Sequence, residues 1–284
     1  MILSIASGKG GTGKTLVASS FALSLEEQVQ LLDCDVEEPN AHVFLRPVFT
    51  GSERVCVPIP VVDENKCNYC GKCAEVCAYN AIAVVKTSVL VFPQLCHGCG
   101  ACSYFCPEDA ISEVGREIGI VETGYSESIE FAHGKLNVGE AMAPPVIRKL
   151  KDHINDKGTV IIDAPPGTSC PVVESVKGSD FCILVTEPTP FGLNDLTLMV
   201  EVTRKLDIPC GILVNRSRGD DANIKQYCLD EGIPILLTIP LDRQIAYNYS
   251  RGITLVEGFP QWREKFLDLY RRITDIVSSQ VTNS

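Results

Sequence analysis

The sequence predicts an α/β fold: a mostly parallel sheet, doubly wound by helices, with a small cysteine-rich α+β domain inserted into it. Three observations predict this. A glycine-rich stretch, "SGKGGTGKT", follows a short apolar run at the start of the chain. Near-continuous apolar runs recur later, as strands buried on both faces of a parallel sheet require. Between these parts lie two similar cysteine-rich segments.

Composition limits the class of protein. The chain has 284 residues, 45% of them hydrophobic and 21% charged, enough for one large domain with a small insert. A net charge of −11 argues against a nucleic-acid partner. No apolar run approaches the ~20 residues of a membrane span, and no secretory leader is evident. We therefore expect a cytoplasmic protein without stable membrane insertion, whose 14 cysteines bind metal rather than form disulfides.

The elements are expected in an alternating order. The expected strands are 1–6, 29–35, 159–167, 180–188, 210–216 and 233–240. The expected helices are 14–25, 144–153, 193–206, 222–231 and 264–277. Because the parallel strands begin before the cysteines and resume after them, we expect residues 1–60 and 113–284 to form one discontinuous domain, with 61–112 inserted into it.

The closing helix, 264–277, has a continuous apolar face. That face comprises Phe266, Leu269, Tyr270, Ile273 and Val277. Two interpretations are open: packing on the core, or attachment to a membrane surface. The charges of this helix are mixed, whereas interfacial helices are usually basic, so core packing is favoured.

The glycine loop predicts a phosphate site. It fits the pattern G-x-x-x-x-G-K-[ST], follows a strand and opens a helix, so a chance glycine turn is disfavoured. The residues expected to surround the nucleotide are Gly8, Lys9, Gly10, Gly11, Thr12, Gly13, Lys14 and Thr15. Backbone N–H groups would converge on the phosphates, Lys14 would bridge the β- and γ-phosphates, and Thr15 would hold Mg²⁺. The sheet is thus expected to be that of a P-loop NTPase.

Three aspartates follow strands of the predicted sheet. Asp33 and Asp35 end the second strand, and Asp163 ends the run "TVIID". Strand-end aspartates often only cap helices. Three of them at the ligand-binding edge of an open α/β sheet favour a functional role.

A second lysine, Lys9, follows the first glycine of the loop, and in this the sequence resembles the MinD/ParA and nitrogenase iron-protein superfamily. The resemblance covers residues 1 to about 280 outside the insert. It implies an ATP- and ADP-binding ATPase that ATP closes into a homodimer, or a heterodimer with a related ATPase. Lys9 would then reach the nucleotide of the opposite subunit. Such a cation can offset charge developing during phosphoryl transfer.

The same resemblance implies roles for other residues. Asp33 would lie beside Mg²⁺, Asp35 would orient the attacking water, and Asp163 would bind Mg²⁺ through a water. Gly167, in the segment "APPG", would sense the γ-phosphate through its N–H. Asn215 would contact adenine, near the segment "IPLD". The spacing alone does not separate ATP from GTP.

The cysteine insert contains two runs of C-x-x-C-x-x-C-x-x-x-C, similar to those of bacterial two-cluster ferredoxins. This resemblance implies two 4Fe–4S clusters, each completed by a cysteine from the other run. The first set would be Cys67, Cys70, Cys73 and Cys106, and the second Cys96, Cys99, Cys102 and Cys77. Zinc is the alternative, but it usually takes paired ligands separated by a long gap. His97, inside the second run, is interpreted as a hydrogen-bond donor or a surface residue rather than a ligand.

Six cysteines lie outside the two runs. Five are expected to be buried small hydrophobic residues: Cys34, Cys56, Cys182, Cys210 and Cys228. Cys170 lies seven residues after Asp163, where the nitrogenase iron protein has a cluster ligand. That arrangement needs a second cysteine per subunit between the insert and Asp163, and this chain has none there. A structural Cys170 is therefore favoured over a ligand.

Three functions remain open. The first is an ATP-gated electron carrier that delivers electrons to a protein partner. The second is a scaffold or carrier ATPase in the assembly of iron–sulfur or heterometal cofactors. The third is a redox-responsive positioning or regulatory ATPase. We rank them in that order, because a fold and an ATPase site do not by themselves specify the output.

Overall fold

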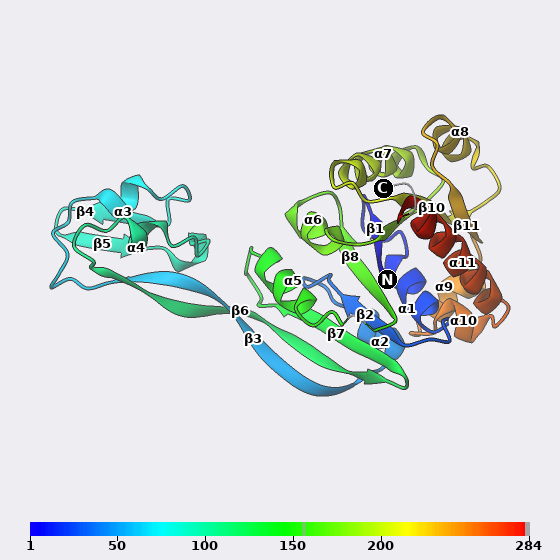
Figure 1. Ribbon diagram of the computed structural model, residues 1–284, viewed down its shortest axis with the longest axis horizontal. Helices are drawn as coiled ribbons and strands as arrows, with labels where there is room; N and C mark the ends of the chain where they lie inside the picture. Colours follow the sequence, from blue (N-terminus) through cyan, green and yellow to red (C-terminus); the bar gives the residue numbers. More distant parts are fainter. Residues whose placement is uncertain (156, 282–284) are drawn as a thin grey trace.

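The computed structural model describes residues 1–155 and 157–281 (Figure 1). The strands of its large sheet are β1 (Ile2–Ser7), β2 (Val29–Asp33), β3 (Val48–Val62), β6 (Ile111–Ser126), β7 (Ile129–Leu136), β8 (Thr159–Pro166), β9 (Phe181–Thr186), β10 (Cys210–Ser217) and β11 (Ile235–Pro240). Within the described residues their order is β11-β10-β9-β1-β8-β2-β7-β6-β3. Strands β11 to β7 are parallel, whereas β6 and β3 are antiparallel to their neighbours.

Helices cover both faces of this sheet. On one face lie α1 (Lys14–Ala22), α2 (Ala41–Leu45), α9 (Arg243–Tyr249), α10 (Leu255–Gly258) and α11 (Trp262–Val281). On the other lie α5 (Pro144–Lys151), α6 (Cys170–Val176), α7 (Pro190–Lys205) and α8 (Ala222–Asp230). Consecutive strand residues point to opposite faces, so Leu213 packs into the first layer and Val214 into the second. The predicted doubly wound, mostly parallel sheet is confirmed.

The closing helix packs on the core. Phe266 and Ile273 of α11 are fully buried, and the Phe266 ring lies 5.7 Å from that of Phe21 on α1. The apolar face predicted from the sequence is therefore occupied by the protein itself, and the membrane-surface interpretation was wrong. None of the described helices is long and apolar enough to cross a membrane.

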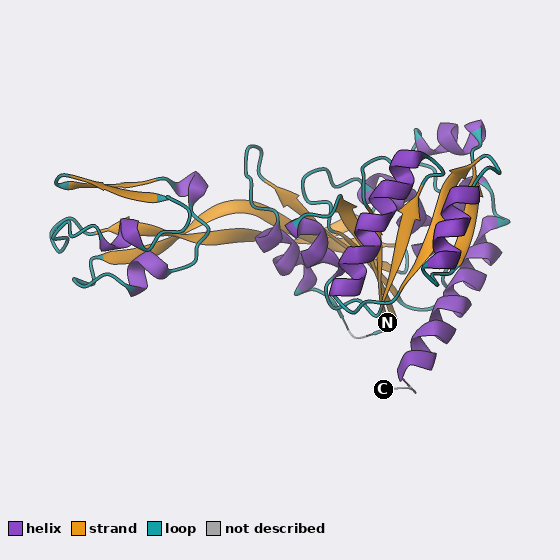
Figure 2. Cartoon of the chain, turned by 90° about the horizontal axis from the view of Figure 1, so that it is seen from above, coloured by secondary structure: helices purple, strands orange, loops and turns teal. Residues whose placement is uncertain are grey.

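Two long strands carry the cysteine-rich segment away from the main body (Figures 1 and 2). Strands β3 and β6, which we call the arm, pair from Val48↔Tyr125 to Val62↔Ile111. At its tip, residues 63–110 form the cysteine lobe. The elements of the lobe are α3 (Lys72–Glu75), β4 (Ile82–Val85), β5 (Ser88–Val91), the 3₁₀ helix η1 (Pro93–Leu95) and α4 (Ala101–Tyr104). The predicted domain boundaries, 61 and 112, fall inside the arm strands.

The arm also corrects one prediction about the cysteines. Cys34, Cys182 and Cys228 are buried and Cys210 is half-buried, but Cys56 is exposed. Cys56 lies on β3 opposite Glu117 of β6, between Val55 and Val57, which are buried in the cluster that contains α5. An apolar residue type in a strand is buried only where a second layer covers that face.

Candidate functional site

The glycine loop lies between β1 and α1 at the carboxyl end of the parallel strands. Gly11 and Gly13 have φ angles of 77° and 92°, in the left-handed region that favours glycine. A Cβ atom at Gly8 would lie 2.3 Å from the backbone oxygen of Asp195, and one at Gly13 would lie 2.4 Å from Nδ2 of Asn215. Both close approaches require glycine, as the phosphate-loop pattern predicts.

Charged groups are concentrated beneath this loop. Lys14 is buried, and burial lowers its pKa against the raising effect of Asp163, Asp35 and Asp33. Burial raises the pKa of Asp163 to about 7 and that of Asp35 to about 6, with Lys14 opposing both shifts. Such perturbed carboxyl groups beside a buried lysine are typical of a functional site.

Asp163 and Asp33 differ in the partners of their carboxylates. The two residues lie side by side on β8 and β2. Both carboxylate oxygens of Asp163 are buried without a hydrogen-bond partner among the described residues. Unsatisfied oxygens of this kind, below a phosphate loop, fit a Mg²⁺ site, because Mg²⁺ takes one or two carboxylates together with phosphate oxygens and waters.

The Asp33 carboxylate is already occupied by backbone groups. Its Oδ1 accepts the N–H of Asp35 at 3.1 Å, and its Oδ2 accepts those of Asn40 and Ala41, both at 2.9 Å. Burial and the neighbouring Asp163 raise its pKa well above the ordinary value. Asp33 therefore holds the loop that leads into α2, a positioning function that the sequence pattern did not reveal.

Two further predicted residues also have partners within the chain. The Gly167 N–H donates to the Ser7 carbonyl at 3.0 Å, so it does not point freely toward a phosphate. Asn215 Nδ2 donates to the Thr12 carbonyl at 2.7 Å, which braces the glycine loop. Beside Asn215 lies a cavity of about 620 Å³ that also contains Leu241 and Tyr249. Residues of the segment "IPLD", the predicted base region, thus line the same cavity as the loop. Tyr249 also lines it, and no sequence motif marked that residue.

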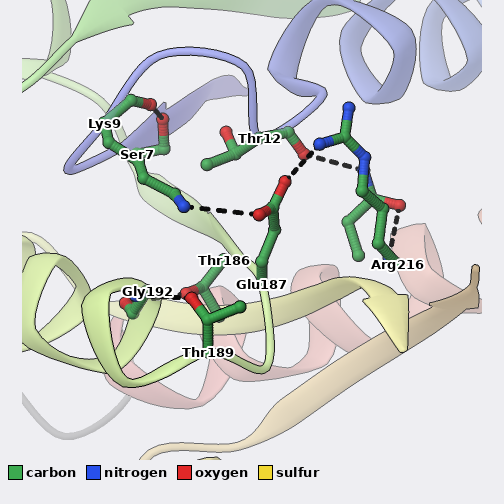
Figure 3. A network of polar contacts seen from close by, with 9 residues as sticks. Ser7, Lys9, Thr12, Thr186, Glu187, Thr189, Gly192 and Arg216 are labelled. Atoms are coloured by element: carbon green, nitrogen blue, oxygen red, sulfur yellow. Dashed lines mark hydrogen bonds and ion pairs between the residues drawn. The ribbon is translucent and has the colours of Figure 1, made fainter. Parts of the chain in front are cut away.

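Lys9 is held inside its own chain (Figure 3). Its Nζ lies 3.3 Å from Oε2 of Glu187, whose Oε1 accepts a 2.6 Å hydrogen bond from Arg216. Glu187 follows β9, and its turn is fixed because the Thr189 hydroxyl accepts the Gly192 N–H at 2.9 Å. In this conformation Lys9 is bound to a carboxylate on its own subunit.

A cluster of rings joins the aspartate edge to the arm. His133 on β7 pairs in register with Asp33. Its Nε2 lies 3.0 Å from Oε2 of Glu122 on β6, and its ring stacks on Phe49 of β3 with centroids 5.0 Å apart. The ring of His42, on α2, lies 5.4 Å away. Burial lowers the pKa of His133, so this residue is neutral at pH 7. Contacts therefore run without interruption from Asp33 to both strands of the arm.

The cysteine lobe contains two cavities, and each gathers four thiols. One is lined by the set Cys67, Cys70, Cys73 and Cys106. The other is lined by the set Cys77, Cys96, Cys99 and Cys102. We call these the first and second cavity. In each, the fourth cysteine comes from the other run, as the ferredoxin resemblance implies.

The thiols of the lobe, all of them among the described residues, do not form a recognisable site for a single metal ion. Among the described residues, no three His, Cys, Asp or Glu side chains are close enough to share one metal ion. A 4Fe–4S cluster takes four separate thiolates around a cubane. Backbone N–H groups already point at sulfur, from Ala81 to Cys77 Sγ at 3.3 Å and from Ala110 to Cys106 Sγ at 3.4 Å.

His97 and Cys170, which the sequence analysis considered as possible ligands, lie outside these two sets. His97 lines the second cavity, and its ring stacks on that of Tyr79. Cys170 is exposed at the first position of α6. Neither observation assigns Cys170 a ligand role.

The glycine loop, the buried lysine and the carboxylates at one sheet edge together define a P-loop nucleotide-binding protein. Residues 3–256 match the CobQ/CobB/MinD/ParA nucleotide binding domain, and the chain belongs to that family. This confirms the resemblance to MinD and ParA that Lys9 and the loop suggested.

Known proteins resemble the chain over nearly all of its length. It is 31% identical to an uncharacterized protein of Methanocaldococcus jannaschii, with 98% of each chain covered. An uncharacterized ATP-binding protein of that organism is 22% identical, over 91% of this chain and 81% of the relative. The septum site-determining protein MinD of Pyrococcus horikoshii, solved with Mg-ADP, aligns with a TM-score of 0.58 at 20% identity, covering 96% of this chain and 95% of that one. At that identity the likeness shows the fold alone.

Proposed function

We propose that this protein binds and hydrolyses ATP as a dimer, and that its nucleotide state controls electron transfer through two 4Fe–4S clusters to a protein partner. The observation that carries the proposal is the exchange of the fourth cysteine. Cys106 lines the first cavity and Cys77 the second, so each cavity combines thiols from both runs. That exchange is typical of two-cluster ferredoxins.

The ATPase roles are assigned from the geometry below the glycine loop. Lys14 would contact the phosphates, while Thr15 and Asp163 would hold Mg²⁺. Asp35 is half-buried with a pKa of about 6, so at neutral pH it is ionised and suited to orienting a water. Lys9 would leave Glu187 to reach the nucleotide of the second subunit, which makes hydrolysis depend on dimer closure.

The redox roles belong to the cysteine lobe. Two 4Fe–4S clusters, held by the two cysteine sets, supply one-electron transfer when bound. The N–H groups of Ala81 and Ala110 donate to the sulfur atoms of Cys77 and Cys106, one thiol of each set. Nucleotide-dependent movement of the loop at Asp33 would reach the lobe through His133 and the arm, since these contacts are continuous.

The test uses protein purified and reconstituted without oxygen. Iron, sulfide and zinc contents are measured first, followed by electron-transfer rates without nucleotide, with ADP and with a non-hydrolysable ATP analogue. We expect about eight irons per chain, two cubanes of four, and a rate that changes with the ATP analogue. Asp35→Ala should trap the closed dimer with its acceptor, and Lys9→Ala should weaken that dimer. Equal rates in all three nucleotide states would refute the gating.

The other two functions give different results in the same preparation. A cofactor-assembly carrier would transfer a cluster to an apo-protein. A positioning ATPase would respond to ATP without passing electrons to any acceptor. Colourless protein containing zinc would overturn every role assigned to the lobe.

A further inference from the structure

The two cavities of the cysteine lobe are covered in different ways, although the two runs are equivalent in sequence. Adding 29 to a residue number in the first run gives its counterpart in the second, as for Cys67 and Cys96. The backbone follows this repeat closely. Gly71 and Gly100 have φ angles of 80° and 75°, and Asn80 and Asp109 have 52° and 48°.

Each cavity has a covering pair at equivalent positions. One member follows the first cysteine of a run, and the other lies two residues after the last cysteine of the opposite run. Over the first cavity this lid pair is Asn68 and Glu108, and over the second it is His97 and Tyr79. The two halves of the repeat therefore carry different side chains at equivalent positions, an amide and a carboxylate in one and two rings in the other.

The first lid is polar and hydrogen-bonded. Asn68 Nδ2 donates to Glu108 Oε1 at 2.9 Å, and Asn68 Oδ1 accepts the Cys70 N–H at 3.1 Å. Both side chains are exposed. Water competes well for hydrogen bonds of this kind, so an exposed polar pair opens at little cost.

The second lid is aromatic. The rings of Tyr79 and His97 lie face to face, with centroids 3.7 Å apart and planes at 6°. Opening this lid separates two apolar ring faces, which water does not compensate. Both cavities touch the arm, the first through Val62 and Ile111 and the second through Pro58, whose ring would lie 2.9 Å from a Cβ at Gly98. Tyr79 and His97 are also exposed, so the two lids differ in the contact that holds each pair together, ring stacking in one and a hydrogen bond in the other.

Charge does not separate the two cavities. Glu108 lines the first, and Glu113, whose Oε1 accepts from Ser103 at 2.7 Å, lines the second. Each cavity thus has one carboxylate in its lining, and the counterpart of Glu113 in the first is the apolar Val84. The linings also differ at Tyr69 of the first cavity, whose counterpart in the second is Gly98, so exchange of the lid pairs is needed to isolate their effect.

We propose that the lid pairs make the two sites inequivalent: the Tyr79–His97 stack opens less readily over the second site than the hydrogen-bonded Asn68–Glu108 pair opens over the first. This inference rests on the proposed function, because it concerns access to the two clusters. It assigns the first site to exchange with solvent and small molecules. It makes the second site the better protected one.

The test separates the two sites with ligand variants of the full chain. Cys106→Ser should leave only the second cluster, and Cys77→Ser only the first. Each protein is reconstituted without oxygen and mixed with the iron chelator EDTA, and loss of the cluster absorbance is followed. We expect the second cluster to be lost about two- to tenfold more slowly, as an aromatic contact of ordinary strength implies.

Lid exchange tests the cause. In Cys106→Ser, the changes Tyr79→Glu with His97→Asn should raise the loss rate to that of the first site. Tyr79→Phe keeps the ring and should leave the rate unchanged. In Cys77→Ser, Asn68→His with Glu108→Tyr should slow the loss. Glu64→Gln, on an exposed residue outside both cavity linings, is the matched control.

The outcomes distinguish this inference from the proposed function. Absence of iron and sulfide from every variant refutes the clusters and therefore both proposals. Clusters present in both ligand variants, with equal loss rates that the lid exchange does not alter, refute the inference alone. If a ligand variant fails to fold, the wild-type chain decides: two phases of loss support the inference, and a single phase overturns it.

Discussion

The nucleotide edge, meaning the glycine loop and the strand ends that carry Asp33 and Asp163, differs from the cysteine lobe in how the chain brings its residues together. At the edge, Lys14, Asp35 and Asp163 come from distant parts of the chain and meet only because parallel strands end together. In the lobe, each set of four thiols comes from two short runs with fixed spacing. The first site depends on the topology of the whole sheet, and the second on local turns.

The two regions also differ in how their polar groups are satisfied. Asp163 is buried with two unpartnered oxygens, whereas the thiols of Cys77 and Cys106 already accept backbone N–H groups. An unsatisfied buried carboxylate destabilises the protein until a cation arrives. The carboxylate of Asp163 thus lacks a partner without a cation, whereas these two thiols already have backbone partners. Each region should therefore assemble and bind its own ligand when the other is altered, even if nucleotide state affects electron transfer, and the predictions that include an iron measurement test that independence.

The largest effect is expected from the exchanged cysteines. Cys106→Ser should remove the cluster of the first cavity although Cys106 belongs to the second run, because each cavity needs all four thiols. Iron content should fall by half, and ATP affinity should be unchanged. Cys56→Ser, on an exposed cysteine of the arm, should keep all its iron. Retention of the first cluster in Cys106→Ser, measured by iron analysis and electron paramagnetic resonance, would show that ligands are not exchanged.

Removal of the loop lysine should affect only the edge. Lys14→Ala deletes the buried cation expected to contact the phosphates, so ATP affinity should fall about 30- to 1,000-fold, as for loss of a buried charged partner. Calorimetric titration with Mg-ATP measures the change, and iron content should not alter. Lys225→Ala, on the exposed surface of α8, is the control. Loss of iron in Lys14→Ala would contradict the independence of the two regions.

The unpartnered carboxylate gives a pH-dependent prediction. The pKa of Asp163 is about 7 in the folded protein and about 3.9 in an unfolded chain. The folded state therefore binds more protons between these values, and this residue lowers the free energy of unfolding as pH rises from about 4 to 7. Asp163→Asn removes this pH-dependent decrease. The free energy of unfolding of the variant minus that of the wild type should therefore be about 2 kcal/mol larger at pH 8 than at pH 5.

Urea unfolding of the nucleotide-free protein without Mg²⁺ measures this difference at both pH values. The same variant should bind Mg-ATP more weakly, because the carboxylate is the expected metal partner. Asp275→Asn, on an exposed residue of α11, is the control and should show no pH-dependent difference. An equal effect of Asp163→Asn at pH 5 and pH 8 would refute the assigned cause.

The sequence predicted the elements that have strong periodicity. The buried parallel strands and the helices between them lie within a few residues of their expected bounds, because their apolar pattern is repeated along the chain. The arm was missed. Outer residues of β3 such as Val48 and Val61 are exposed apolar residues, so burial does not impose an alternating pattern there.

For the candidate site, the sequence did not predict the contacts between residues that are distant along the chain. Local motifs predicted the glycine loop and, through the ferredoxin resemblance, the two cysteine sets, each of which lines one cavity. They did not reveal that Asp33 holds the loop before α2, or that Glu187 and Arg216 surround Lys9. Those contacts join segments that only the tertiary fold brings together, and no local pattern marks Glu187 as different from other glutamates.

The contact between Lys9 and Glu187 gives the smallest predicted effect. If Glu187 retains Lys9 in its own subunit, Glu187→Gln should free the lysine while keeping the size of the side chain. The side chains are 33% and 13% exposed, so the pair is worth little, and the ATP concentration needed for dimers should fall only about two- to fivefold. Analytical ultracentrifugation at a series of ATP concentrations measures the ATP concentration at which dimers form. Glu201→Gln, on the exposed face of α7, makes the same charge change away from the loop and should have no effect. Unchanged or weaker dimerisation in Glu187→Gln would mean that the contact between Lys9 and Glu187 supports the ATP-bound state rather than opposing it. The iron content of the protein should be the same in either case, because the lobe is built independently.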